Sequence, residues 1–500
     1  MPHIQTNTDI PPSDQKLALE KKLEENLQFF SKALSIGKSY DVVLRKMEFA
    51  GKDFGILYIN GFVKDHILSD ILRYLSTLER EQLVSDVLQN LLSTYMAHIQ
   101  VSAVKTTAEV VSAVLTGQTA FLIDTIDQAL IVDARQYPNR TPEEPDLEKV
   151  VRGARDGFVE TLVINTVMTR RRIRDPRLIF ENMKIGVRSK TDIAVAYIQD
   201  VADPNLVKEI KQRLEKIEVD GIPMAEKSVE EFLVQKGWNP YPVVRYTERP
   251  DVAAIHLLEG HVLIYVDTSP SVMITPATFF HHLQHAEEYR NNPAVGGYIR
   301  MVRLFAVLAS VFLVPLWLLF AVFHRDWLPH GLTFIGPEKS AKVPIALQFI
   351  LADLGLDMMR MAAIHTPTPL ATAMGLIAAV LIGQIAVGVG LFNNETILYL
   401  AIAVLGMYAT PSYEVGMANR LIRLGLIVAV WAFKLPGLII GVGLWMLLLF
   451  TTQSVGRPYM WPLFPLEIGA FLDLFIRSPI QRINKRPAIV RPQDPDRQPN

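Results

Sequence analysis

Hydrophobic and polar positions divide this chain of 500 residues into two unlike parts. Almost all of its long uncharged runs lie after residue 303, whereas the first 300 residues or so mix apolar and charged positions throughout. A helix needs about 20 apolar residues to cross the hydrocarbon core of a bilayer. The pattern therefore predicts an integral membrane protein, in which an α/β soluble part is followed by an α-helical multi-span membrane domain.

Four uncharged runs in the second part are candidate membrane spans. They cover residues 304–323, 370–392, 396–413 and 435–455. A shorter run, 424–433, meets the last of them at Lys434 and Pro436, and this pair predicts either one long broken helix or a tight hairpin. Arg300 and Arg303, with further basic residues after the last run, place both ends in the cytoplasm by the positive-inside rule. Such a topology requires an even number of crossings, for which we take four, with six as the alternative.

The run between residues 343 and 365 differs from the others because it carries charge. Asp353, Asp357 and Arg360 follow one another at spacings of four and three residues, so they share one face of a helix. A charged side chain that faces lipid costs roughly 2.5–3.5 kcal/mol on insertion scales. We therefore expect an amphipathic helix at the membrane interface or beside a watery cavity, where the two carboxylates attract cations to an ion pathway.

The run 370–392 carries small residues spaced by four, a pattern that lets helix backbones approach closely in lipid. The small residues are Ala371, Gly375, Ala379 and Gly383, followed by Ala386 and Gly390. Two interpretations stay open, which are packing within one chain and packing between copies of the chain around a pore. In the second, Gly375, Ala379 and Gly390 form the contacts between copies. Gln384, the strongly polar group at mid-span, then lines the pore with its neighbours Gly383 and Val387.

Glu414 follows a proline, in the run Thr410-Pro411-Ser412-Tyr413-Glu414. Proline removes a helix hydrogen bond and opens a break where carbonyl groups can face a cavity. A carboxylate beside such a break can bind cations or protons, which makes Glu414 a further candidate for the ion pathway. The alternative is a helix end at the membrane surface, with Glu414 near Arg420.

The polar part contains an internal repeat. Residues 53–59 and 192–198 are strand-like runs that each precede a helix, with Tyr58 and Tyr197 in register. Leu115-Thr-Gly117 and Leu258-Glu-Gly260 each lead into a further apolar run that ends in an aspartate. Each copy thus shows the order strand, strand, helix, helix, glycine, strand, strand. We predict two related α/β subdomains, at about 38–136 and 178–276.

A stretch rich in proline and charge at 137–145 separates the two copies. We divide the chain into an N-terminal helix and tail (1–37), two cytoplasmic α/β subdomains (38–145 and 146–290), a membrane domain (291–456) and a cytoplasmic C-terminal segment with a disordered tail (457–500). The N-terminus lacks the basic region and the apolar run of a signal peptide, so we expect the soluble part to lie on the cytoplasmic side of the membrane.

The composition excludes several kinds of chemistry. The chain has no cysteine, which excludes disulfides, thiolate metal sites and cysteine nucleophiles, and its net charge of −1 gives no general case for nucleic-acid binding. Ile36-Gly37-Lys38-Ser39 resembles the end of a phosphate-binding loop, but it precedes a strand and Lys32 stands where the first glycine belongs. We expect no cofactor, no catalytic residue and no enzyme activity.

Two polar clusters have both a functional and a structural interpretation. One comprises His281, His282, His285 and Glu288, and the other comprises Arg170, Arg171, Arg172 and Arg174. His281 and His285 have the spacing of metal ligands on a helix, but without an H-E-x-x-H pattern we favour a solvated linker helix. The arginines would suit a phosphate or an anionic headgroup, but we favour a solvated helix end or an interface between the subdomains.

Short motifs spread over the chain resemble those of a known family. They are Arg155-Asp-Gly-Phe158, Asn165, Arg170-Arg-Arg-Ile173, Leu178, Gly186, Ser189-Lys-Thr191 and Gly383-Gln384. On these motifs, residues 25–487 resemble the GerA family, the A subunits of spore germinant receptors in endospore-forming bacteria. Receptor subunits usually carry an Arg-x-Pro element where His365-Thr-Pro367 stands in this chain, and this departure argues against direct nutrient sensing.

The resemblance implies a location and an activity that the residues alone do not give. It implies the inner spore membrane, with both termini in the cytoplasm of the spore core. It also implies a ring of identical subunits, expected to be a pentamer, that conducts monovalent cations during germination alongside a small membrane partner protein and germinant receptor complexes. Two alternatives stay open: a nutrient-sensing A subunit without a pore of its own, and a scaffold for other channels.

Overall fold

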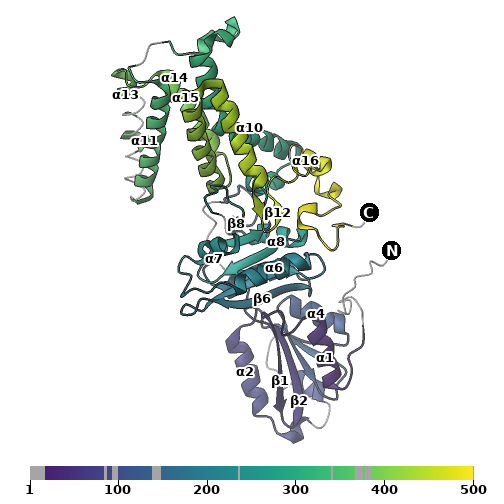
Figure 1. Ribbon diagram of the computed structural model, residues 1–500. Helices are drawn as coiled ribbons and strands as arrows, with labels where there is room; N and C mark the ends of the chain where they lie inside the picture. Colours follow the sequence, from purple (N-terminus) through teal and green to yellow (C-terminus); the bar gives the residue numbers. More distant parts are fainter. Residues whose placement is uncertain are drawn as a thin grey trace. The chain divides into compact units, whose positions relative to one another are not determined.

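The structure is a computed structural model that describes residues 17–83, 87–92, 100–137, 148–234, 237–338, 342–365, 375–377, 380 and 384–498. The chain forms two compact units, whose elements are labelled in Figure 1. The α/β unit comprises residues 1–235, 244–276 and 479–500, and the helical unit comprises residues 236–243 and 277–478. The predicted fold class, an α/β part followed by a helical part, is confirmed.

The first half of the α/β unit is a five-stranded antiparallel sheet between two layers of helices. Its strands are β1 (Val42–Phe49), β2 (Lys52–Ile59), β3 (Val101–Val104), β4 (Thr119–Ile123) and β5 (Ala129–Val132), in the order β1-β2-β4-β5-β3. Its helices are α1 (Leu23–Ala33), α2 (Asp65–Ser76), the short η1 (Arg80–Leu83) and α3 (Val87–Asn90), and α4 (Thr107–Leu115). Successive residues of β4 point to opposite faces, so Ala120 and Leu122 pack with α1 and α4, whereas Phe121 and Ile123 pack with α2.

The second half of the α/β unit repeats this architecture. Its strands are β6 (Leu178–Ile185), β7 (Thr191–Ile198), β8 (Arg245–Thr247), β9 (Val262–Val266) and β10 (Val272–Thr275), in the order β6-β7-β9-β10-β8. Its helices are α5 (Leu162–Arg172), α6 (Pro204–Glu215), α7 (Ala225–Val234) and α8 (Pro250–Glu259). The strand order is the same as in the first sheet, so the prediction of two related subdomains is confirmed. The short strands β3 and β8 were not predicted.

The repeat extends to individual hydrogen bonds. The side chain of Asn26 bonds the backbone N–H and C=O of Glu20, and Asn165 bonds the same two groups of Val159, six residues before it in both cases. The Asp124 carboxylate accepts from the first N–H of α1 at 3.1 Å, and Asp267 accepts from the first N–H of α5 at 3.0 Å. Each repeat therefore includes the helix before its sheet, which the predicted limits at 38 and 178 leave out.

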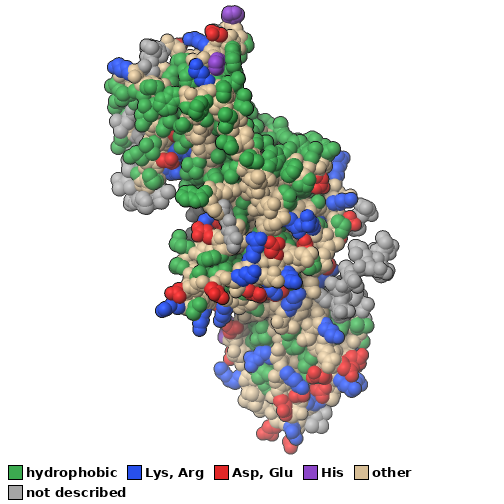
Figure 2. Space-filling view, in the orientation of Figure 1, with side chains coloured by type: hydrophobic (Ala, Val, Ile, Leu, Met, Phe, Trp, Pro, Cys, Tyr) green, Lys and Arg blue, Asp and Glu red, His purple; other side chains and the backbone are tan. Residues whose placement is uncertain are grey.

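Where the structure describes it, the helical unit is built around four longer helices. These are α10 (Pro293–Trp317), which continues as the π-helix η4 (Leu318–Phe323), α11 (Ile345–His365), α14 (Asn394–Tyr408) and α15 (Tyr413–Thr451). Shorter elements are η3 (His281–Leu283), α9 (Ala286–Arg290), η5 (Arg325–Trp327), η6 (His330–Ile335), α13 (Ala386–Gly388), β11 (Gln453–Ser454), β12 (Arg457–Pro458) and α16 (Ile468–Asp473). On the face shown in Figure 2, hydrophobic side chains gather over these helices.

The long helix α15 is a hairpin of two antiparallel segments. Lys434 has a non-helical backbone, with φ 53° and ψ −128°. Gly437 lies against the carbonyl of Ala429 with no room for a Cβ, and Gly441 lies against the side chain of Leu426. A straight helix would separate these pairs by about 12 Å and about 22 Å. Of the two alternatives for residues 424–455, the structure therefore shows the tight hairpin.

Two helical stretches, Pro293–Phe323 and Tyr413–Thr451, are long and apolar enough to cross a membrane, and Asn394–Tyr408 is a shorter apolar helix. Of the expected span 370–392, the structure describes residues 375–377, 380 and 384–392. The predicted number of crossings therefore stays a prediction.

The end of the C-terminal segment, from residue 479 onward, belongs to the α/β unit. It contains η8 (Ile480–Arg482) and η9 (Ala488–Val490), whose Ile489 and Val490 are buried. Beyond them, the backbone N–H of Gln493 donates to the carbonyl of Val201 at 2.9 Å. The sequence suggested a disordered tail from Arg491, whereas the structure orders this segment up to residue 498.

Candidate functional site

A cluster of five charged side chains lies inside the helical unit, and we call it the charge cluster. It comprises Asp353, Asp357 and Arg360 on α11 with Arg420 and Arg423 on α15. The spacing on α11 predicted that its three members share a face, and the ion pairs between Asp357, Arg360 and Arg420 are consistent with that. The two partners on α15 are 60 or more residues away in sequence, so no local pattern pointed to them.

Asp353 is the centre of the charge cluster. Its carboxylate is fully buried, and both oxygens accept from Arg423 at 2.9 Å. Arg420 approaches the same carboxylate at 3.0 Å. Arg423 also donates to the carbonyl of Ser310 on α10 at 3.0 Å, so one arginine joins three helices.

Asp357 lies one turn further along α11 and is partly exposed. It accepts from Arg360 at 2.7 Å and forms an ion pair with Arg420. The Arg360 guanidinium lies 5.7 Å from the centre of the Tyr413 ring, at the start of α15. With three arginines and two aspartates the charge cluster has one excess positive charge, and both carboxylates are neutralised by partners of the same chain.

A buried polar link ties α11 to α14. Gln348 is fully buried, and its amide nitrogen donates to the carbonyl of Val343 at 2.9 Å. Its amide oxygen accepts from the backbone N–H of Asn393 at 2.9 Å and from the hydroxyl of Thr396 at 3.1 Å. The sequence analysis missed this residue, although a glutamine in an apolar run is a signal that could have identified it.

The remaining residues predicted for an ion pathway lie on α13, on α15 or in the segment before α13. Gln384 is exposed and Val387 is half-buried. Glu414 is half-buried in the first turn of α15, whose N-cap is Ser412. Gly383 lies outside the described residues. A pore between copies of the chain therefore stays a prediction.

Of the residues predicted to pack between copies, Gly375 and Gly390 are described, whereas Ala379 is not. A Cβ on Gly375 would meet no atom of the described residues within 4 Å. Gly390 has a φ of 74°, which a glycine adopts without strain, and it ends the helical turn of α13.

The predicted histidine cluster does not form a single helix. His281 and His282 are buried in η3, whereas His285 is the N-cap of α9 and accepts from the N–H of Glu287 at 3.2 Å. Glu288 is fully buried and accepts from Arg300 at 2.8 Å, with Arg303 as a second cationic partner. A solvated linker helix is therefore wrong for this segment, and Glu288 serves an ion-pair cluster at the start of α10.

Of the arginines at residues 170–174, Arg170 lies at the junction of the two subdomains, which is one of the two structural interpretations that we favoured. Arg170 is almost completely buried, and its guanidinium donates to both oxygens of Asp41 at 2.8 and 3.2 Å. It also donates to the carbonyls of Asp175 and Leu178 at 3.0 and 2.8 Å. Asp41 precedes β1, so this pair joins the first subdomain to the second.

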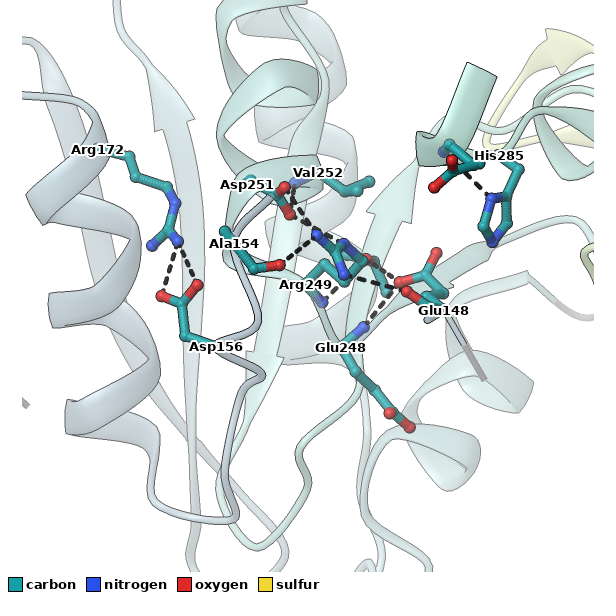
Figure 3. Close-up of polar contacts among 11 residues, drawn as sticks. Glu148, Ala154, Asp156, Arg172, Glu248, Arg249, Asp251, Val252 and His285 are labelled. Carbon is teal, nitrogen blue, oxygen red and sulfur yellow. Dashed lines mark hydrogen bonds and ion pairs between the residues drawn. The ribbon is translucent and has the colours of Figure 1, made fainter. Parts of the chain in front are cut away.

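Two further residues of the family motifs, Asp156 and Arg172, together with Arg249 from outside the motifs, fix the segment before α5 (Figure 3). Arg172 donates to both oxygens of Asp156 at 2.7 Å. Arg249, which is fully buried, donates to the carbonyl of Glu148 at 3.1 Å and to that of Ala154 at 2.9 Å. These contacts give the motif residues a structural task within the α/β unit.

Comparison with known proteins identifies the family. Residues 30–489 match the Bacillus/Clostridium GerA spore germination protein family. The chain is 48% identical over 486 residues to stage V sporulation protein AF of Bacillus subtilis, covering 97% of this chain and 98% of that protein. It is 30% identical to spore germination protein KA of the same organism, over 93% of this chain and 86% of that protein.

A solved structure is also similar in sequence. The N-terminal domain of the A subunit of the Bacillus megaterium germinant receptor GerK3 is 30% identical, and the match covers 53% of this chain and 98% of that domain with a TM-score of 0.42. The sequence resemblance noted from the motifs is confirmed by the family match and by these relatives. The chain belongs to the GerA family of spore germination proteins.

Proposed function

We propose that this germination protein is an ion channel in which identical chains form a ring, expected to be a pentamer, and release monovalent cations during germination. Family membership gives the biological setting, and the two long apolar stretches give the means of crossing a membrane. The proposed location is the inner spore membrane, with both termini in the spore core. A small membrane partner protein and germinant receptor complexes are the proposed associates.

One observation carries the proposal of a pore between copies. Gln384 is exposed in the single chain, in a segment where Ile385 and Val389 are exposed as well. Cβ atoms placed on Gly375 and Gly388 would meet no described atom within 4 Å. A polar amide in hydrocarbon needs water or a partner, and small residues with open space beside them suit a neighbouring backbone. A second copy of the same segment would supply both.

The charge cluster supports the proposal as a frame that connects the helices around such a pore. It holds α10, α11 and α15 together through Ser310, Asp353 and Arg423. In this arrangement Asp353 and Asp357 are both paired with arginines, so they can attract cations only after those pairs open. Glu414, at the start of α15, is the third proposed carboxylate of the ion pathway.

Substitution of Gln384 tests the pore assignment. Gln384→Leu should change the rate of K⁺ release from liposomes that contain the purified chain, because it removes the polar group proposed to face the ions. Gln453→Leu makes the same chemical change at an exposed position of β11 and should leave the rate unchanged. Unchanged flux in a well-assembled Gln384→Leu protein would contradict the pore assignment.

A second candidate function is nutrient sensing without a pore, and a cavity in the α/β unit favours it. The cavity has a volume of about 530 Å³ and is lined among others by Lys38, Glu181, Tyr197, Lys208, Lys211 and Gln493. Three lysines and two glutamates, Glu181 and Glu215, line it, so a small anionic ligand would meet one excess positive charge. Saturable binding of an anionic nutrient that is lost in Lys208→Ala, together with an absence of current from the purified chain, would favour this second function.

A further inference from the structure

Three metal-ligating side chains meet at the turn between α8 and β9. His256 is in the last turn of α8, Glu259 is its last residue, and His261 directly precedes β9. One ligand atom from each lies within 4.8 Å of those of the other two. His256 is 6% exposed and His261 is fully buried, whereas the side chain of Glu259 is 17% exposed. The carboxylate approaches the Nδ1 atom of His256 at 3.3 Å.

The chemistry of these groups suits a borderline metal ion. Two imidazoles and a carboxylate form a common set of protein ligands for Zn²⁺, which leaves a fourth position for water. Only a neutral imidazole can bind a metal ion.

The internal repeat shows that the turn itself does not need these side chains. In the second copy the N–H of Gly260 donates to the carbonyl of Leu257, and that of His261 donates to the carbonyl of His256, both at 3.0 Å. In the first copy the N–H of Gly117 donates to Val114 at 2.8 Å, and that of Gln118 donates to Ala113 at 3.0 Å.

The glycines of the two turns have nearly equal φ values, 96° at Gly117 and 101° at Gly260. The backbones therefore match, and the positions of His256, Glu259 and His261 are taken by Ala113, Thr116 and Gln118 in the first copy. One copy thus forms the turn without a histidine or a carboxylate. Burial of such groups in the other copy costs free energy that the fold does not require.

We propose that His256, Glu259 and His261 form a binding site for a divalent transition metal ion such as Zn²⁺. The site belongs to the α/β unit, whereas the charge cluster and the residues assigned to the ion pathway belong to the helical unit. It does not depend on the proposed channel function.

The C-terminal segment would respond to the metal ion. Arg497 lies 3.3 Å from the carboxylate of Glu259, and Arg486 donates to the carbonyl of Leu258 at 2.8 Å. Val490 and Pro492 pack beside Gly260. A metal ion on Glu259 would compete with the Arg497 guanidinium for the same carboxylate. Metal binding should therefore release Arg497 and loosen the end of this segment.

The test uses the full-length chain in detergent, purified with a tag that contains no histidine, and titrated with Zn²⁺. The key variant is His256→Ala with Glu259→Thr and His261→Gln, which installs the residues of the first copy and should fold because that copy does. His66→Ala removes an exposed histidine of α2 and serves as the matched control. The chain has 11 histidines, so this control is needed to recognise adventitious binding.

We expect the wild-type chain and His66→Ala to bind one more equivalent of Zn²⁺ than the triple variant, and to gain thermal stability that the triple variant does not gain. His261→Gln removes one of the three ligands and should lower the affinity for Zn²⁺ more than about 100-fold. Loss of a residue that only hydrogen-bonds a ligand already lowers metal affinity by about 10–100-fold. Arg497→Gln should tighten it several-fold. Equal stoichiometry and affinity in the wild-type chain and the folded triple variant would overturn the proposal.

Discussion

The α/β unit and the helical unit each contain a buried arginine that forms an ion pair with an aspartate. The two arginines differ in how many of their N–H groups have a hydrogen-bond partner. Arg170 uses its guanidinium on Asp41 and on two backbone carbonyls. Arg423 holds Asp353 and one carbonyl, but its Nε atom has no hydrogen-bond partner among the described residues.

The two aspartates differ as well. Asp41 accepts from Arg170 and from the hydroxyl of Ser39 at 2.6 Å. Asp353 is shared by two arginines, so losing one leaves the other. An ion pair whose polar groups all have hydrogen-bond partners forms a permanent joint between two parts of the chain. An ion pair with an unpartnered N–H group and a second arginine as a spare partner can rearrange at a lower cost in free energy. We therefore assign the first pair to fixed assembly of the subdomains, and the second to a frame that can change during gating.

The largest expected effect is at the subdomain junction. Asp41→Ala should destabilise the chain by about 3–5 kcal/mol, because it leaves the Arg170 guanidinium buried without a counter-charge. Thermal unfolding of the purified chain, followed by far-UV circular dichroism, measures the loss. The control is Asp70→Ala, which removes an exposed aspartate of α2 and should change stability by less than about 0.5 kcal/mol. Equal stability of the two variants would contradict a permanent joint.

A somewhat smaller loss is expected at the centre of the charge cluster. Asp353→Asn should cost about 2–4 kcal/mol, because it removes the charge that faces both Arg420 and Arg423. Resistance of the detergent-solubilised helices to unfolding by sodium dodecyl sulfate gives the measurement. A loss below about 1 kcal/mol would show that the carboxylate is not the centre of the frame.

Removal of one arginine from the charge cluster tests whether the other arginine can still pair with Asp353. Arg423→Gln should cost only about 1–2 kcal/mol, because Asp353 keeps its contact with Arg420. The same unfolding assay applies, and the double variant with Arg420→Gln should lose more than the sum of the single changes. Simple additivity would argue against the spare-partner interpretation.

The smallest effect concerns an ion pair at the cavity of the α/β unit. Burial raises the pKa of Glu181, whereas hydrogen bonds from Lys211 and Tyr197 lower it. Together with the nearby positive charge of Lys211, the hydrogen bonds have the larger effect, so the pKa is lower than its ordinary value. A lowered pKa stabilises the fold above the ordinary value of 4.5, and this contribution is lost as the pH falls through the folded-state pKa. Lys211→Met should therefore cost less than about 1 kcal/mol at neutral pH and nothing at lower pH. A cost that does not change with pH would indicate lost packing instead.

Local patterns were sufficient for some of these features. Strand periodicity and the paired tyrosines Tyr58 and Tyr197 predicted the repeat, and an interface between the subdomains was one of two interpretations of the arginine run. The i, i+4, i+7 spacing on α11 placed its three charges on one face. In each case the signal lies within one element or between two similar segments.

Other features depend on contacts that sequence spacing does not encode. The partners of Asp353 come from α15, and the hairpin at Lys434 depends on the packing of Gly437 and Gly441. The strands β3 and β8 have only four and three residues, too few to show an alternating pattern. His256, Glu259 and His261 are close in sequence, but their significance appears only when the turn is compared with its copy.

The current through planar bilayers that contain the purified full-length protein tests whether this chain alone forms a cation-conducting pore, as we propose. The protein should first be shown by light scattering in detergent to be larger than one subunit. We expect discrete openings that pass K⁺ and Na⁺ but not Cl⁻, with a conductance altered by Gln384→Leu. A folded, oligomeric preparation that gives no current above that of empty bilayers would contradict the proposal.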